Sequence, residues 1–316
     1  MTPIETVLIT GANAGLGKDT ARQLAALPST RRIYLAVRNL EKGEAAKAEL
    51  VETTGRDIFE LVRVDTSDLD IVREAVATLS EPVDAVVLNA GGPGGDSAGV
   101  ATSYGVVGSF AVNVLGHAAL VDELIAAGKL TNTVVFVSSE AARGIPSMGM
   151  KRPNLPSSSV DDFAAIADGT AFPSFDAMKA YGPIKYVGTM WMSAMARRHP
   201  LIRFISVSPG ATSGTNAADQ VGAVQRFIFT RIAYPLMTLL GRAHGLEKGA
   251  KRYVDVLVDD AYQSGHFYAS AYPGTIGSLV EQGPIFEDLT NEQFQDNAYA
   301  AVRRFLHEPQ VAAPAK

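Results

Sequence analysis

Residues 7–17, Val-Leu-Ile-Thr-Gly-Ala-Asn-Ala-Gly-Leu-Gly, constrain the fold of this chain more than any other stretch. Three apolar residues lead into Thr10 and Gly11, and Gly15 and Gly17 open a run of helix-forming residues. This order predicts a strand, a tight turn and a helix. Glycine suits such a turn because a side chain would hold a phosphate away from the N–H groups at the helix N-terminus. The stretch therefore predicts a phosphate site, although glycine-rich turns also arise for purely steric reasons.

The composition excludes several classes of protein and site. With 47% hydrophobic and 19% charged residues, the 316-residue chain is suited to a globular fold with a sizeable core. A formal net charge of −5 argues against nucleic acid as a partner, because such binding needs a basic surface. The chain has no cysteine, and its five histidines lack ligand spacing, so we expect no disulfide and no metal.

The sequence carries no evident targeting or membrane-spanning signal. The first strand begins within a few residues of the N-terminus, which leaves no room for a signal peptide. No uninterrupted apolar run reaches the roughly 18 residues that a spanning helix needs. We therefore expect no integral membrane segment and a cytoplasmic location.

Strand-like and helix-like stretches alternate along the chain. After the first strand, short apolar runs occur at residues 31–38, 60–65, 83–89, 133–137, 202–208 and 265–270. Helical patterns occur at residues 18–25, 40–54, 66–79, 104–127, 246–258 and 291–307, and another runs from about residue 174 or 181 to residue 197. Such strands are typical of a parallel sheet covered on both faces. We predict an α/β fold in which residues 1–316 form a single-domain, Rossmann-type, doubly wound parallel sheet of about seven strands.

Two inserted segments interrupt this alternation and are predicted to form walls of a substrate pocket. Residues 141–175 lose periodicity and are rich in proline, and residues 211–245 include the strongly apolar stretch 227–240. The apolar stretch suits either a lid over a bulky, lipophilic substrate or a contact with a membrane surface. The tail after residue 307 is expected to be loose.

Polar and small residues stand where the predicted strands end. In an open parallel sheet, ligands bind beyond the carboxyl ends of the strands. The residues at those ends are Thr10-Gly11, Arg38, Asp65-Thr66, Asn89-Ala90-Gly91, Ser139 and Pro209-Gly210. Six such positions in order along one edge predict one shared site.

These residues, with Asn113 and the spacing Tyr181-x-x-x-Lys185, resemble the short-chain dehydrogenase/reductase family over nearly the whole chain. The resemblance implies a dinucleotide-binding oxidoreductase. The long insertion before Tyr181 and the C-terminal region from Ser264 look more loosely similar to the protochlorophyllide oxidoreductase and retinol dehydrogenase branch. The cysteines that a pigment reductase of that branch normally carries are absent from this chain.

Tyr181 and Lys185 are the predicted catalytic pair. A spacing of four places both side chains on one face of a helix. A free tyrosine has a pKa near 10, so a nearby ammonium that favours the phenolate would make it a usable general acid and base at neutral pH. Because Pro183 follows closely, we expect the helix to start at or just before Tyr181.

The resemblance implies roles for three further groups. Ser139 would hold the substrate oxygen beside Tyr181, with Ser138 the less favoured of the two serines. Asn113 would hold a water that links Lys185 to solvent, and Lys185 would also contact the nicotinamide ribose.

The end of the second strand indicates which dinucleotide is bound. An acidic residue there would accept from the ribose 2′-OH and repel a 2′-phosphate. This chain has Arg38, with Lys42 one turn further on, and a guanidinium pairs well with phosphate. We therefore predict NADPH/NADP+ as the cofactor.

The remaining cofactor contacts are carried over from the family by position. Asp65 and Thr66 would frame the adenine, and Asn89, Ala90 and Gly91 would lie at the adenosine ribose. Leu16 would lie near the nicotinamide, and Thr212 or Ser213 near the carboxamide or phosphates. The other implied contacts are Gly11, Asn13, Ala14, Gly15, Gly17, Tyr181, Lys185, Pro209 and Gly210.

The leading hypothesis is an NADP(H)-dependent oxidoreductase that moves hydride between nicotinamide C4 and a carbonyl or alcohol carbon. Two alternatives stay open: a C=C double-bond reductase of the protochlorophyllide reductase type, and a non-catalytic NADP(H)-binding sensor. The long helices before the fifth strand and after Tyr181 are suited to pairing in a homodimer or to being covered by the inserted segments.

Overall fold

A computed structural model describes residues 3–213 and 243–306. The predicted lid stretch 227–240 and the tail after residue 307 lie outside the described residues. The described residues form one sheet of eight strands in the order β3-β2-β1-β4-β5-β6-β7-β8. The strands are β1 Thr6–Thr10, β2 Arg32–Val37, β3 Phe59–Arg63, β4 Val83–Leu88, β5 Leu130–Val137, β6 Arg203–Val207, β7 Phe267–Ser270 and β8 Leu279–Glu281.

Helices connect these strands and complete the alternation that the sequence predicts. The longer helices are α1 Gly15–Ala25, α2 Leu40–Thr54, α3 Leu69–Thr78, α5 Gly116–Ala126, α6 Val160–Asp168, α7 Ala177–Arg198, α10 Leu246–Val258 and α11 Glu292–Leu306. The short ones are α4 Gly108–Phe110, the π-helical turn η1 Ala111–Leu115, and the 3₁₀ turns η2 Glu140–Arg143, η3 Pro146–Met148 and η6 Glu287–Thr290.

The strand order reverses between β1 and β4, and this places the site. The chain runs outward from β1 through β2 to β3, returns to pair β4 with β1, and then continues through β5 to β7, all in parallel. At such a reversal the loops after neighbouring strands leave toward opposite faces and open a crevice at the carboxyl edge. The predicted doubly wound sheet is therefore confirmed.

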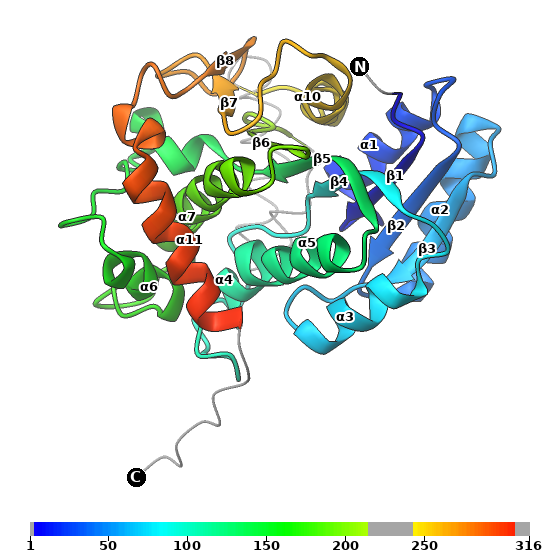
Figure 1. Cartoon of the computed structure of the whole chain (residues 1–316). Coiled ribbons are helices and arrows are strands. Elements are labelled where there is room, and N and C mark those ends of the chain that lie inside the picture. The colour runs from blue at the N-terminus through cyan, green and yellow to red at the C-terminus, as the bar shows by residue number, and fades with distance from the viewer. Residues whose placement is uncertain (1–2, 214–242, 307–316) are drawn as a thin grey trace.

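The helices cover both faces of the sheet (Figure 1). Helices α1, α2 and α10 lie on one face, and α3, α5 and α7 lie on the other, with α6 and α11 packed outside α7. The two faces have separate hydrophobic clusters, which explains why the strands between them are apolar on both sides.

Local sequence signals fix where several helices begin. The Asn39 side chain accepts a hydrogen bond from the Lys42 N–H and caps α2, whose predicted bounds are confirmed. The Asp68 carboxylate accepts from the N–H groups of Asp70 and Ile71 and caps α3. Caps of this kind bind N–H groups that would otherwise lack a partner at a helix start.

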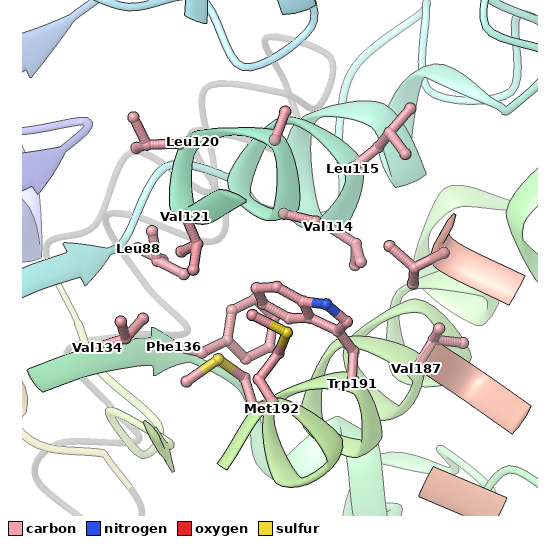
Figure 2. Close-up of a cluster of buried hydrophobic side chains, with 14 of the residues drawn as sticks. Leu88, Val114, Leu115, Leu120, Val121, Val134, Phe136, Val187, Trp191 and Met192 are labelled. Atoms are coloured by element: carbon pink, nitrogen blue, oxygen red, sulfur yellow. The ribbon is translucent and has the colours of Figure 1, made fainter. Parts of the chain in front are cut away.

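The larger cluster holds α7 against the centre of the sheet (Figure 2). Trp191 and Met192 of α7 gather with Phe136 of β5, and the helical segment that contains Val114 and Val121 lies across from them. Trp191 is 1% exposed. A Cβ on Gly188 would lie 2.4 Å from the Phe136 ring, so glycine lets α7 approach β5 this closely.

Four local expectations are corrected by the structure. The helix expected from residue 104 begins at Gly108 and contains the π-helical turn η1. The insertion contains α6, whose start carries a capping box between Ser159 and Asp162, a signal that apolar periodicity does not reveal. An eighth strand, β8, pairs antiparallel with β7 and was too short to be predicted.

The fourth correction concerns α7, which begins at Ala177, between the two starts at about residues 174 and 181 that the sequence allows, and not at Tyr181 as Pro183 suggests. The Asp176 carboxylate accepts from the N–H groups of Met178 and Lys179 and caps the helix there. Pro183 is thus inside α7. A proline at this position removes a single helical hydrogen bond, the one to the Lys179 carbonyl.

One described helical stretch is long and apolar enough to cross a membrane by length and composition alone. It is Gly108–Ala126, and 72% of its most apolar window is buried inside the protein. Asp122 and Glu123 interrupt the stretch, so it is not an uninterrupted apolar run. Its side chains pack in the larger core cluster.

Gly116→Ala is expected to lower the free energy of unfolding by about 2 kcal/mol or more, because overpacking against rigid backbone cannot relax easily. A Cβ at Gly116 would lie 1.9 Å from the Thr66 carbonyl oxygen. Chemical denaturation measures the change. The control is Gly95→Ala, which has no atom within 4 Å of the added methyl group and should shift stability little. Equal stabilities of the two variants would contradict the packing argument.

Candidate active site

A cavity of about 590 Å³ opens at the carboxyl edge of the sheet. It is lined by the glycine turn after β1, by the ends of β2 to β6 and by α7. The predicted residues that line it are Thr10, Gly11, Asn13, Ala14, Gly15, Leu16, Arg38, Asp65, Thr66, Asn89, Ala90, Gly91, Ser139, Tyr181, Lys185, Pro209, Gly210 and Thr212. Of the predicted site residues, all within the described part of the chain, four do not line it: Gly17, Lys42, Asn113 and Ser213.

The three glycines of the turn have different tasks. Gly11 has a φ of +66° and Gly15 a φ of +53°, conformations that a side chain rarely adopts. No atom of the described residues lies within 4 Å of a Cβ placed on Gly15, which leaves that side of the turn open to the cavity. Gly17 lies behind the turn, where a Cβ would be 2.6 Å from both the Gly11 carbonyl oxygen and the Asn89 side chain.

The start of α1 fits an anion. The residue before the helix, Ala14, provides no side-chain cap, and the first turn has no acidic residue. Gly15 and Leu16 of this turn line the cavity, and among the described residues no carboxylate or hydroxyl caps the helix start. An uncapped helix N-terminus beside an open glycine suits the pyrophosphate of a dinucleotide.

A hydrogen-bond network ties the ends of β1 and β4 together. The Thr10 hydroxyl oxygen accepts from the N–H groups of Asn89 and Ala90, at 2.8 and 2.9 Å. Its proton is then free to be donated to His117 Nε2, 3.0 Å away. The Asn89 amide donates to the Thr10 carbonyl at 2.8 Å. Asn89 therefore shapes the crevice as well as lining it.

His117 completes this network as a neutral residue. Since Nε2 accepts from Thr10, Nδ1 carries the proton and donates to the Asn113 carbonyl at 3.2 Å. Burial, followed by the charge of Lys185, lowers the pKa of His117 to about 3. His117 is thus a packed histidine, as expected for the histidines of this chain.

Asn113 clamps the loop after β4. Its amide oxygen accepts from the Gly92 N–H at 3.1 Å, and its amide nitrogen donates to the Gly92 carbonyl at 2.9 Å. A Cβ on Gly91 would lie 2.4 Å from the same amide oxygen. The side chain of Asn113 is thus bound to the loop, and its role in holding a water stays a prediction.

Tyr181, Ser139 and Lys185 meet at the end of β5. The Tyr181 hydroxyl is hydrogen-bonded to Ser139, while the Ser138 hydroxyl is buried against Thr189 at 2.7 Å. Lys185 Nζ donates to the Val137 carbonyl at 2.8 Å and lies 5.7 Å from the centre of the Tyr181 ring. The second serine of the pair is therefore the one that faces Tyr181.

The protonation of the pair differs from the expectation that an ammonium would make the phenol acidic. Burial raises the pKa of Tyr181 to about 12, against the opposing effect of the Ser139 hydrogen bond. Burial also lowers the pKa of Lys185 to about 7, because its ammonium is almost fully enclosed. Desolvation is therefore the main cause of both shifts, and the phenol keeps its proton at neutral pH.

A buried ion-pair network, not foreseen from the sequence, joins the ends of β5, β6 and β7. Glu140, directly after Ser139, accepts from Arg252 at 3.5 Å and from the Ser270 hydroxyl at 3.0 Å, and also bonds the Ser208 hydroxyl. Arg252 donates to the Ser208 carbonyl at 3.0 Å. The network fixes Ser139 relative to the Pro209-Gly210 loop. The charge of Arg252 on the otherwise apolar face of α10 was the available signal.

The residues at the end of β2 separate into two groups. Arg38 is exposed at the rim of the cavity, and no carboxylate of the described residues forms an ion pair with it. Lys42 is exposed on α2, outside the cavity. Only Arg38 is therefore placed to bind a ligand in the cavity.

The loop after β6 is held on two sides. The Pro209 carbonyl lies 2.7 Å from His244 Nε2, and a Cβ on Gly210 would lie 2.8 Å from both His244 and Arg252. Thr212 lines the cavity, whereas the hydroxyl of Ser213 bonds the His244 carbonyl at 3.1 Å. Of the two alternatives for the carboxamide or phosphates, Thr212 is the one in the cavity.

Lys185→Met is expected to flatten the dependence of stability on pH. The pKa of Lys185 is about 7 in the folded protein against an ordinary value of 10.5, so the unfolded chain binds the proton more strongly. The wild-type free energy of unfolding should therefore rise from pH 7 to pH 9, by about 1.4 kcal/mol per pH unit from this group. Chemical denaturation of both proteins at several pH values measures the difference in slope.

The slope is the informative quantity because the variant also leaves the Val137 carbonyl without its donor. The same slope in both proteins would mean that Lys185 keeps its charge in the folded state well above pH 7.

The family model for short chain dehydrogenase matches residues 5–150. A short chain dehydrogenase/reductase of Annulohypoxylon moriforme is 29% identical over 325 residues, covering 96% of this chain and 87% of the relative. Protochlorophyllide reductase B of Oryza sativa subsp. japonica is 28% identical over 286 residues, covering 84% of this chain and 69% of that protein.

Other matches are partial. The aligned parts span 27% and 56% of the lengths of short-chain dehydrogenases from Sordaria araneosa and Aspergillus ruber. Among solved structures, a short-chain type dehydrogenase/reductase from Mycobacterium ulcerans has a TM-score of 0.60 at 19% identity, covering 92% of this chain and 97% of that one. Together with the glycine turn and the Tyr181–Lys185 pair, these findings show that the chain is similar to short-chain dehydrogenases/reductases over most of its length.

Proposed function

We propose that this protein is an NADP(H)-dependent oxidoreductase that reduces the carbonyl group of a bulky, lipophilic substrate, with residues 1–316 acting as a single catalytic domain. The observation that carries the proposal is that the glycine turn and the group Ser139, Tyr181 and Lys185 line the same cavity. Hydride transfer needs a dinucleotide and a proton donor at one place, and this cavity brings suitable residues for both together.

Tyr181 is the proton donor in this proposal. Its pKa of about 12 keeps the phenol protonated at neutral pH, which suits delivery of a proton to a carbonyl oxygen. Ser139 orients that oxygen by donating a hydrogen bond. When bound, NADPH supplies the hydride, and the carbonyl gains that hydride at carbon and the proton at oxygen. Lys185, with a pKa of about 7, can return a proton toward Tyr181.

Arg38 supports the choice of NADP(H) over NAD(H). It stands at the rim of the cavity next to Asp65 and the glycine turn, the end at which an adenosine would lie. A guanidinium there pairs with a 2′-phosphate, and no carboxylate occupies the strand end to bind a 2′-OH instead. Similarity to short-chain dehydrogenases/reductases alone leaves this choice open.

Apolar residues at the other end of the cavity support a lipophilic substrate. Ile145 and Met148 of the insertion and Pro93 of the loop after β4 line it. Met148 is 53% exposed, which is unusual for a large apolar side chain. A hydrophobic substrate would cover this surface.

Tyr181→Phe should abolish carbonyl reduction while NADPH still binds, because the variant lacks only the transferable proton. Turnover is measured at the nicotinamide absorbance band with a panel of ketones and aldehydes, and NADPH binding by calorimetry. Unchanged turnover would defeat the assignment of Tyr181. Wild-type protein that binds NADPH and turns over no member of a broad panel would favour the non-catalytic sensor.

Arg38→Ala should weaken NADPH binding about 10- to 100-fold, since a hydrogen bond to a charged group contributes roughly 1.5–3 kcal/mol. Binding of NADH, which lacks the 2′-phosphate, should change little. Arg63→Ala is the matched control, because Arg63 is an exposed arginine at the end of the neighbouring strand β3 and outside the cavity. Equal loss of NADPH and NADH affinity in Arg38→Ala would contradict the phosphate contact.

Reduction of a C=C bond is a second candidate, favoured by the similarity to protochlorophyllide reductase B over 84% of this chain. The same Tyr181 would then protonate a carbon rather than an oxygen. Enones in the substrate panel, and assays with protochlorophyllide in light and in darkness, separate the two reactions by their products.

A further inference from the structure

A second tyrosine, Tyr253, borders the cavity from the opposite face of the sheet. Tyr253 belongs to α10 and packs in the same core cluster as Val137 and Val207. Tyr181, in contrast, belongs to α7 on the other face of the sheet. Tyr253 is 0% exposed. Neither the sequence pattern nor the family motif pointed to this residue.

The Tyr253 hydroxyl is buried and has no hydrogen-bond partner among the described residues. Other enclosed tyrosines of this protein are bonded: the Tyr34 hydroxyl lies 2.7 Å from Ser80 Oγ, and Tyr186 donates to Asp288 at 2.7 Å. A buried hydroxyl without a partner destabilises a protein, because it has lost its bonds to water. At the border of a ligand cavity, such a group is suited to bind a ligand.

The neighbours of Tyr253 show which end of the cavity it borders. One turn earlier on α10, Gly249 packs against Thr212 of the loop after β6 and against Leu16 of the glycine turn. A Cβ on Gly249 would lie 2.7 Å from Thr212 and 2.8 Å from Leu16. The adjacent Arg252 donates to the Ser208 carbonyl. Tyr253 therefore borders the cavity near Leu16 and the loop after β6.

The hydroxyl is suited to donate a hydrogen bond at any physiological pH. Burial, followed by the nearby Tyr181 and Glu140, raises the pKa of Tyr253 well above its ordinary value of 10. The group thus keeps its proton. Its natural partner is an uncharged acceptor oxygen that packs against the floor of the cavity.

We propose that Tyr253 is a binding residue for the nicotinamide end of the dinucleotide, donating a hydrogen bond to the carboxamide oxygen. The inference rests on the proposed dinucleotide function and adds a contact to it. Because solvent does not reach the hydroxyl, a small rotation of the ring accompanies binding. The unliganded protein carries the unpaired group, and the bound dinucleotide pairs it.

The test compares two ligands with wild type and Tyr253→Phe. The ligands are NADP+ and 2′-phospho-ADP-ribose, which lacks only the nicotinamide. The variant should bind NADP+ about three- to tenfold more weakly, as expected for one neutral hydrogen bond. It should bind 2′-phospho-ADP-ribose like the wild type. Calorimetry measures the four affinities.

Thermal unfolding provides a readout that needs no ligand. Without ligand, Tyr253→Phe should unfold at the same or a higher temperature, since it removes an unpaired buried hydroxyl. The matched control is Tyr34→Phe, which breaks the bond to Ser80 far from the cavity. That variant should unfold at a lower temperature and keep the wild-type affinity for both ligands.

Several outcomes would overturn the proposal. One is equal NADP+ affinity of Tyr253→Phe and wild type, including the case in which only a substrate KM rises. Another is an equal loss of affinity for both ligands, which would mark a structural role. A lower unfolding temperature without ligand would mean that the hydroxyl is already paired in the free protein. Wild-type protein that binds neither ligand would instead defeat the proposed dinucleotide function itself.

Discussion

The close packing of α7 on the end of β5 is the contact on which the candidate site depends. Gly188 lets the helix approach the Phe136 ring, and the Ser138 hydroxyl bonds Thr189. Lys185 Nζ then reaches the Val137 carbonyl, one residue before the serine pair. These contacts set the distance between α7 and the sheet, and with it the positions of Tyr181 and Ser139. A larger residue at position 188 would move the helix and both hydroxyls apart.

This packing also encloses charged groups, and the enclosure determines the chemistry. Lys185 is 1% exposed and Glu140 is 3% exposed. Burial disfavours the charged form of Lys185 and the phenolate of Tyr181. The burial that keeps the Tyr181 phenol protonated therefore also lowers the free energy of unfolding, because it encloses the Lys185 amine. Glu140 is compensated by Arg252 and two serine hydroxyls, as a buried carboxylate must be.

The hydrogen bonds at the centre of the sheet have a different task. Thr10, Asn89 and His117 join β1 and β4 at the point where the strand order reverses. His117 is also hydrogen-bonded to the Asn113 carbonyl, and the side-chain amide of Asn113 binds Gly92. The glycine turn and the loop after β4 are thereby fixed to each other, and these hydrogen bonds set the shape of the crevice between them.

The sequence by itself determined the elements and the positions of the main site residues. Local patterns specified the strand, turn and helix around Gly11 to Gly17, the exact bounds of α2 and α10, and the spacing of Tyr181 and Lys185. Such features depend on residues a few positions apart, so periodicity and capping reveal them. The tertiary structure alone decided the rest. Glu140 meets partners 68 and 130 residues away in the chain, and Tyr253 reaches the cavity only because α10 folds under the sheet. The tertiary structure also decided the protonation of Tyr181 and Lys185. Their pKa values shift because packing removes water from around them, and this burial exists only in the assembled fold.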